Sequence, residues 1–239
     1  MQFSKYKIVI ANAFPFAARM SRLIKAFTTV YSKTRLSYSQ HGEDVFVWDL
    51  LNKHFPNTRY NYVDVGAFHP TLLSNTYLFY RKNINGITVE PNHELAGLHK
   101  FFRSKDIQLE IACGNLNQLS VFHLQKTFPA LSSLNNISNK RKVTCHYVPV
   151  FNLDTVCGNL GCSKIYFLSI DVEGFDFQVL QGANNILTNT FIVCIECNSK
   201  ESEDCVTCFL REKDFIFIGR FSCNLIFRNE KFNDSIAND

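Results

Sequence analysis

The stretch Tyr62-Val-Asp-Val-Gly-Ala-Phe-His-Pro70 decides the fold. Its apolar first half ends in Gly66, and a helical pattern follows from Thr71 to about Arg81. A Val-rich strand, a glycine turn and a helix predict the first unit of a doubly wound α/β sheet. Because Gly66 has no Cβ, a ligand can approach its backbone closely. We expect the first amides of the following helix to be free donors there.

Acidic residues close this strand and the next one along the chain. Asp64 lies at the end of the first strand, and Ile84–Glu90 is predicted as the second, with Glu90 suited to bind a ribose diol. A nicotinamide-dependent dehydrogenase would need G-x-G-x-x-G, but Phe68 and His69 stand where further glycines would be. A ligand with a ribose and no pyrophosphate fits better, and S-adenosylmethionine is the commonest such ligand.

Charge is distributed unevenly along the 239 residues. Residues 1–36 carry seven basic and no acidic residues, which leaves the remainder with 18 basic and 21 acidic residues, a net charge of −3. The body is therefore not expected to bind nucleic acid. The basic extension, with its interleaved Phe, Leu and Ile, could lie on an anionic membrane surface or form a solvated basic helix along the domain edge.

The apolar segments and cysteines favour a cytoplasmic protein. No stretch reaches the roughly 20 apolar residues that span a bilayer. The apolar run from Ile8 to Ala18 is the size of a signal-peptide core, but Asn12 and Pro15 interrupt it. The nine cysteines are odd in number and scattered, which predicts free thiols in a reducing compartment.

One cysteine pattern resembles paired zinc knuckles, because Cys194-x-x-Cys197 is followed by Cys205-x-x-Cys208. The spacer is shorter than zinc sites usually have. Cys194 also belongs to a predicted strand, on which side chains three residues apart point to opposite faces. We therefore expect no metal site there.

The first half of the domain begins with polar Gln40, His41 and Glu43, which precede an amphipathic helix and predict a lid or first-turn element. The following elements are predicted from periodicity and turn residues: a helix over 91–102 and strands over 107–114, 116–124 and 142–151. The third strand end often contacts an adenine in such sheets. The polar segment 126–139 predicts a mobile loop over the site.

Two further strands of the second half also end in acids. Residues 164–174 predict a buried central strand that ends in Asp171 and Glu173, and residues 191–195 predict a strand that ends in Glu196. The connecting elements are helices over 175–187 and 202–211, and strands over 214–218 and 224–227 form a closing antiparallel pair. Ligands bind beyond the carboxyl ends of such strands, so Asp64, Glu90, Asp171, Glu173 and Glu196 should share one crevice. The expected organisation is an extension at 1–36, one domain at 37–230 and a polar, frayed tail at 231–239.

An ordered set of motifs carries a family resemblance. The motifs are Ser39-Gln-His-Gly-Glu-Asp44, Val63-Asp-Val-Gly-Ala67, Ser74-Asn-Thr76, Val89-Glu-Pro-Asn92, Val148-Pro-Val with Leu153-Asp-Thr155, Ile170-Asp-Val-Glu-Gly174 and Ile195-Glu196. Together, over about residues 38–228, they closely resemble the FkbM family of S-adenosylmethionine-dependent methyltransferases. Each motif alone is weak, but the ordered set is specific.

This resemblance implies a class I methyltransferase fold: an α/β, Rossmann-like three-layer sandwich with a mostly parallel seven-stranded sheet and an antiparallel last strand. It implies that the turn of Asp64, Gly66 and Ala67 holds the methionine part of S-adenosylmethionine. It also implies that Glu90 and Asn92 bind the ribose. Further implied contacts are Ala112 to Asn115 near the adenine, Gln40 and Glu43 over the cofactor, and Asp171 and Glu173 facing the methyl group.

The resemblance further implies methylation of a hydroxyl oxygen on a sugar, a lipid-linked glycan or a polyketide. We expect Asp171 to be the general base and Glu173 to orient the acceptor, with His41 or His69 as rival bases because imidazole titrates near neutral pH. The paired acids could alternatively hold a divalent cation that binds a diol. The alternative at the level of class is a scaffold protein that keeps the fold without catalysis.

Overall fold

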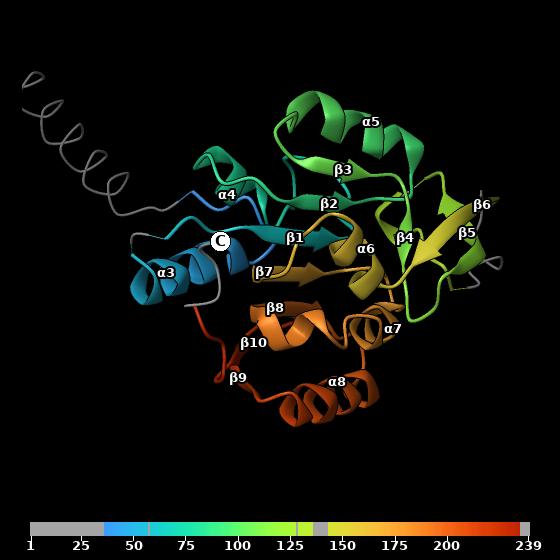
Figure 1. Cartoon of the computed structure of the whole chain (residues 1–239). Coiled ribbons are helices and arrows are strands. Elements are labelled where there is room, and N and C mark those ends of the chain that lie inside the picture. The colour runs from blue at the N-terminus through green and yellow to red at the C-terminus, as the bar shows by residue number, and fades with distance from the viewer. Residues whose placement is uncertain (1–35, 57, 128, 136–142, 235–239) are drawn as a thin grey trace, which may run out of the picture. The chain divides into compact units, whose positions relative to one another are not determined.

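The computed structural model describes residues 36–56, 58–127, 129–135 and 143–234, so the basic extension up to residue 35 lies outside the described residues. The sheet built from these residues has seven strands in the order β3-β2-β1-β7-β8-β10-β9 (Figure 1). The strands are β3 (Ile107–Leu109), β2 (Ile87–Val89), β1 (Tyr62–Val65), β7 (Ile165–Ile170), β8 (Thr190–Glu196), β10 (Asn224–Asn229) and β9 (Phe215–Phe221). β10 runs antiparallel to both of its neighbours. The predicted sheet with its antiparallel last strand is therefore confirmed.

Helices cover both faces of this sheet and complete three layers. The helices α3 (Glu43–His54), α4 (Tyr77–Arg81) and α5 (His93–Phe102) lie on one face, and α6 (Leu153–Asn159), α7 (Asp176–Gln181) and α8 (Lys200–Glu212) lie on the other. Alternation along β1 explains the arrangement, since Tyr62 packs with α3 and α4 while Val63 and Val65 pack with α6 and α7. None of the described helices is long and apolar enough to cross a membrane.

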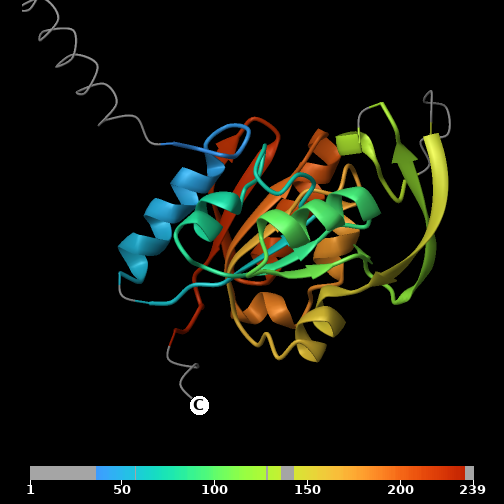
Figure 2. The same cartoon turned by 90° about the horizontal axis from the view of Figure 1, so that it is seen from above.

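A second, three-stranded sheet has the order β4-β6-β5 and is built from β4 (Ala112–Cys113), β5 (Gln118–Gln125) and β6 (Val143–Phe151). β5 and β6 pair antiparallel, with Phe122, Val148 and Val150 in a small core of their own. The arrowheads of β1, β2 and β7 point toward this small sheet, and Figure 2 shows it at the opposite end of the domain from α3. The small sheet therefore flanks the carboxyl edge of the main one.

Several predicted boundaries were wrong. The helix expected from Thr71 begins only at Tyr77, because the chain first forms an irregular loop in which Phe68 and Leu73 adopt positive φ values of 46° and 55°. The strand expected over 107–114 breaks after Leu109, and its second part pairs with β6 instead of β2. The helix expected to reach Leu187 ends at Gln181, followed by a short 3₁₀ turn, Ile186–Asn189.

The expected frayed tail is also wrong for its first residues. The Phe232 ring packs against Phe55 and Phe191 at centroid distances of 5.7 and 5.2 Å. The Asp234 carbonyl accepts a 2.9 Å hydrogen bond from Lys164 Nζ. These contacts hold residues 231–234 on the amino-terminal edge of the sheet.

Candidate active site

Two adjoining chambers open at the carboxyl ends of the central strands. The Glu90 chamber has a volume of about 520 Å³, including space open to solvent. It is lined mainly by apolar residues, namely Val65, Val89, Ala112, Phe122 and Phe175, together with Glu90. The Asp64 chamber encloses about 600 Å³ and is polar, with Gln40, Asp64, Asn75 and Glu196 in its wall. The two share Gly66, Phe68, Ala130, Asp171 and Glu173, so both acids of the β7 end lie at their junction.

Gly66 is required at this junction. Its φ is +78°, and a Cβ there would lie 1.8 Å from the carbonyl oxygen of Asp171. The Gly66 and Ala67 amides donate to the Val89 carbonyl at 2.9 and 3.1 Å. The expectation of free amide donors from a helix at this turn is therefore wrong: the helix begins eleven residues later, and the turn amides already have partners on β2.

Glu90 is buried at the end of β2 and faces the chamber named after it. Its Oε1 accepts from the Asn92 amide at 2.8 Å and its Oε2 from the Phe68 amide at 3.0 Å. Burial raises the pKa of Glu90 to about 7, and the two backbone hydrogen bonds oppose this shift. Each oxygen keeps a second lone pair with which it can accept a hydrogen bond from a ligand hydroxyl.

His99 hydrogen-bonds to the backbone of the turn at Phe68. Its Nε2 lies 3.0 Å from the Phe68 carbonyl oxygen, and the ring is fully buried. Burial lowers the pKa of His99 to about 4, so the ring is neutral near pH 7 and Nε2 carries the proton that it donates to this carbonyl. The positive φ of Phe68 is thus fixed by Glu90 at its amide and by His99 at its carbonyl.

Asp64 is buried in the second chamber and bonded to the loop that follows β1. Thr76 Oγ1 donates to Asp64 Oδ2 in a short hydrogen bond, and the same threonine oxygen accepts from Arg103. Burial raises the pKa of Asp64, and the nearby Arg103 guanidinium opposes that effect. Asp64 thus has a buried cation beneath it and an open chamber in front of it.

Three carboxylates gather at the end of β7 and β8. One oxygen each of Asp171, Glu173 and Glu196 lie within 4.8 Å of one another, close enough to share a divalent cation. Burial, and then the charge of Glu196, raise the pKa of Asp171 well above its ordinary value. A carboxylate in such surroundings is a stronger base than an exposed aspartate.

Of the polar residues before and at the start of α3, one lines a chamber and one bonds α3 to the sheet. Gln40 lines the Asp64 chamber. Glu43 is fully buried and accepts from Asn224 Nδ2 at 2.8 Å, so it joins the start of α3 to β10. His41 is exposed and is outside the wall of both chambers.

Other predicted residues also have structural partners. The Asn92 side chain caps α5 by accepting from the Glu94 amide at 3.0 Å, and Asn115 is exposed beyond β4. Nδ1 of His69 accepts from the Thr71 and Leu72 amides at 3.2 and 3.1 Å. Asp64, Gly66, Ala67, Glu90, Ala112, Asp171 and Glu173 do reach the chambers, as does Gln40.

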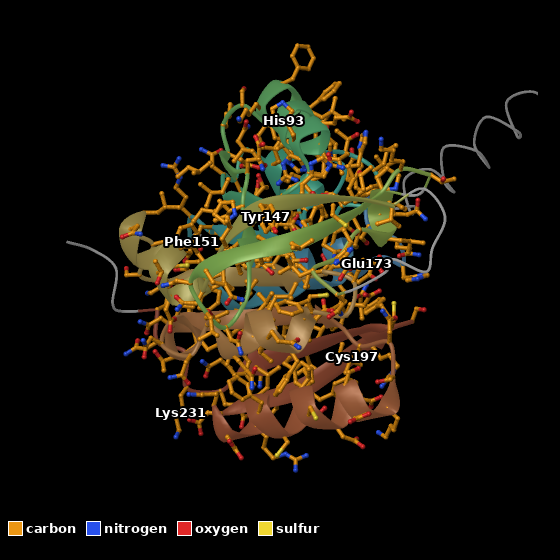
Figure 3. The ribbon with its side chains drawn as sticks, turned by 90° about the vertical axis from the view of Figure 1, so that its right-hand side faces the viewer. His93, Tyr147, Phe151, Glu173, Cys197 and Lys231 are labelled. Atoms are coloured by element: carbon orange, nitrogen blue, oxygen red, sulfur yellow. The ribbon has the colours of Figure 1, made fainter. Side chains whose placement is uncertain are left out.

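Sequence reasoning missed the contribution of the small sheet. Phe122 of β5 lines the Glu90 chamber, together with Pro129, Ala130, Ser132, Ser133 and Leu134. Ser133 Oγ donates to the Glu173 carbonyl at 2.9 Å, which ties this loop to the β7 end. Figure 3 looks from this side, with Tyr147 and Phe151 on β6 and Glu173 beside the hairpin. The polar composition of 126–139 predicted a loop over the site, but not which residues face it.

Strand order and the position of the chambers define the class of protein, a class I methyltransferase fold. The FkbM methyltransferase domain matches residues 64–228, which is more than half of the chain. The chain therefore belongs to the FkbM methyltransferase family. No curated protein matches it.

Solved structures with a similar arrangement are distant in sequence. The FkbM methyltransferase of Methylobacillus flagellatus KT is 14% identical with a TM-score of 0.47, over 88% of this chain and 60% of that one. A candidate RNA methyltransferase of Pyrococcus horikoshii is 12% identical with a TM-score of 0.40, over 82% and 91%. This chain thus spans about 60% of the length of the Methylobacillus protein.

Proposed function

We propose that this protein is an S-adenosylmethionine-dependent O-methyltransferase acting on a hydroxyl of a sugar, a glycan or a similar natural product. The observation that carries the proposal is Glu90, a buried carboxylate at the end of β2 in a chamber with mainly apolar walls. An adenosine needs both features: apolar contacts for its base and a hydrogen-bond acceptor for its ribose. The chemistry of this donor set therefore fits the cofactor.

The two chambers divide the cofactor between them. In this proposal Ala112 and Phe122 contact the adenine, and Glu90 accepts from the ribose hydroxyls. Asp64, in the polar chamber, accepts from the ammonium of the amino-acid part. When bound, the cofactor supplies an electrophilic methyl group on a sulfonium, at the junction where Asp171 and Glu173 lie.

The residues at the junction act on the acceptor. The Asp171 carboxylate would take the hydroxyl proton as the acceptor oxygen bonds to the methyl carbon and the carbon–sulfur bond breaks, with S-adenosylhomocysteine as the leaving group. Such a base contributes roughly 10²–10⁴-fold in rate. Glu173 orients the acceptor by accepting a hydrogen bond from a second hydroxyl of the same molecule. The chamber walls hold oxygen and carbon in line and exclude water. His41 and His69 are the rival bases, and neither lines a chamber.

Binding of the cofactor tests the proposal directly. We expect isothermal titration with S-adenosylmethionine to give micromolar affinity that is lost in Glu90→Ala. The control is Glu94→Ala, an exposed carboxylate on α5, which should bind like the unchanged protein. Tritium transfer from labelled cofactor to a panel of hydroxylated sugars then identifies the acceptor. If the unchanged protein does not bind the cofactor, the scaffold alternative replaces the enzyme.

We also propose a cytoplasmic location with peripheral membrane contact through residues 1–36. The nine free cysteines suit a reducing compartment, and the seven basic residues of the extension suit an anionic lipid surface. Cosedimentation with phosphatidylserine vesicles tests the contact, with neutral vesicles as the control. Equal partition to both vesicle types would contradict it.

A further inference from the structure

Arg103 is a fully buried cation directly beneath the loop between β1 and α4. It follows the last residue of α5, and none of its surface is exposed. A guanidinium in such a place costs much free energy unless its donors are paired. The partners that it has therefore indicate what the fold gains from it.

The nitrogens of the Arg103 guanidinium donate hydrogen bonds to three separate segments of the chain. Nε donates to Asp106 Oδ2 at 2.7 Å, and one terminal nitrogen donates to Tyr62 Oη at 2.9 Å. That same nitrogen donates to Thr76 Oγ1 at 2.9 Å, while the other lies 3.3 Å from Ser74 Oγ. Arg103 thus links the start of β1 to the end of the loop that borders the Asp64 chamber.

Thr76 passes this contact on to the binding site. Its hydroxyl has one proton, which it donates to Asp64 Oδ2, and its oxygen accepts from Arg103. The direction of both hydrogen bonds is therefore fixed. Thr76 is itself fully buried, so no water competes for the hydroxyl.

We propose that Arg103 and Thr76 are positioning residues that hold Asp64 as an oriented carboxylate for the ammonium group of the cofactor. The inference rests on the proposed function and goes beyond it, because neither residue lines a chamber. Arg103 acts through Thr76, and Thr76 acts through Asp64. These two successive hydrogen bonds, from Arg103 to Thr76 and from Thr76 to Asp64, form a relay. The relay affects recognition of the amino-acid part alone, since Glu90 holds the ribose through separate partners.

Two ligands separate this role from a general effect on the fold. S-adenosylhomocysteine carries the amino-acid part, and 5′-methylthioadenosine has the same adenosine and a thioether without it. Thr76→Val keeps the shape of the side chain and removes both hydrogen bonds. We expect it to weaken S-adenosylhomocysteine binding by about 10- to 100-fold, the range for a hydrogen bond to a charged group. Binding of 5′-methylthioadenosine should change by less than about twofold.

Thr76→Ser is the matched variant because it restores the hydroxyl, and it should recover most of the lost affinity. Asp64→Asn keeps the shape of the final residue and should show the same selective loss, which maintains the test if Thr76→Val fails to fold. Melting temperatures of all variants check the fold. Equal loss of both ligands, or no loss of either, would overturn the relay while leaving the proposed function intact. Failure of the unchanged protein to bind either ligand would remove the proposed function and the relay together.

Discussion

Asp64 and Asp171 belong to neighbouring parallel strands and differ in the charges around them. Asp64 lies within β1, opposite Ser169 of β7, Asp171 directly follows β7, and both line the Asp64 chamber. Beneath Asp64 lies the buried Arg103, reached through Thr76. The neighbours whose charges act most strongly on Asp171 are all carboxylates, led by Glu196.

In the roles proposed above, the environment of the two acids separates them, since both are aspartates. A neighbouring cation favours the ionised form, so Asp64 is suited to hold a positively charged ligand group. Neighbouring carboxylates favour protonation, so Asp171 is suited to accept a proton. Burial raises the pKa of both acids, but a neighbouring cation opposes this rise at Asp64, whereas neighbouring carboxylates add to it at Asp171.

The largest expected effect is on the Asp171 side. Asp171→Asn removes the base and should lower the rate of methyl transfer by about 10²–10⁴-fold, while cofactor affinity stays within a few-fold. Single-turnover transfer from labelled cofactor to the acceptor found by screening measures the rate. Glu201→Gln, an exposed acid on α8, is the control. A rate for Asp171→Asn equal to that of the control would transfer the role of base to another residue.

On the Asp64 side, the largest effect should be on stability. Arg103→Met leaves Asp106 buried without its cation and should lower the free energy of unfolding by about 3–5 kcal/mol. Urea denaturation followed by circular dichroism measures the loss. Lys105→Met changes an exposed cation two residues away and should cost little. A loss below about 1 kcal/mol for Arg103→Met would show that the pair is not what holds this side together.

Glu90 is intermediate between Asp64 and Asp171, because its hydrogen-bond donors are neutral amides and not a cation or a carboxylic acid. Its pKa is raised from 4.5 to about 7, so between these values the folded protein binds more protons than the unfolded chain. Stability from this residue is therefore present below pH 4.5 and is lost as the pH rises to 7, by up to about 3 kcal/mol. Glu90→Gln lacks this loss, so its free energy of unfolding relative to that of the unchanged protein should rise from pH 5 to pH 8. Unfolding free energies at both pH values measure it, and a constant difference would contradict it.

Removing a like charge should sharpen the contrast between the two acids. Glu196→Gln takes away the carboxylate whose charge acts most strongly on Asp171, so the pKa of Asp171 should fall. The pH at which kcat/KM reaches half of its plateau should fall with it. Asp154→Asn, whose carboxylate bonds to the Asn185 amide away from the site, should leave it unchanged. A profile that does not move for Glu196→Gln would mean that Asp171 does not control the rate.

The smallest effect concerns Asn92, which the family resemblance places beside the ribose and the structure places at the start of α5. Loss of this helix cap in Asn92→Ala should cost about 1 kcal/mol of stability and leave cofactor affinity unchanged. Thermal unfolding and isothermal titration measure the two quantities. A tenfold loss of affinity without loss of stability would show that Asn92 contacts the cofactor.

The sequence alone determined the order of the elements and the main acids of the site. Short apolar runs predicted β1, β7 and β8, because a strand that is buried on both faces is apolar at successive positions. Since parallel strands end at one edge, Asp64, Glu90 and Asp171 could be placed in one crevice before any contact was known. The helix predicted over 91–102 agrees with α5, His93–Phe102, to within two residues, because a Pro-Asn turn marks its start.

Only the tertiary structure decided what surrounds those acids. Arg103 reads in the sequence as one more basic residue after a helix, and nothing local indicates that it is buried under Thr76. Residues 71–76 were predicted as helix, but they belong to an irregular loop from Phe68 to Thr76. Its conformation is fixed by Glu90, His99 and Arg103, which are distant in the chain. Local periodicity records which way a side chain points along its own element, whereas burial and the charge of neighbours arise from the packing of separate segments. The positions of the acids thus follow from the sequence, whereas the shifts in their pKa arise from burial and from the charges that the fold places around them.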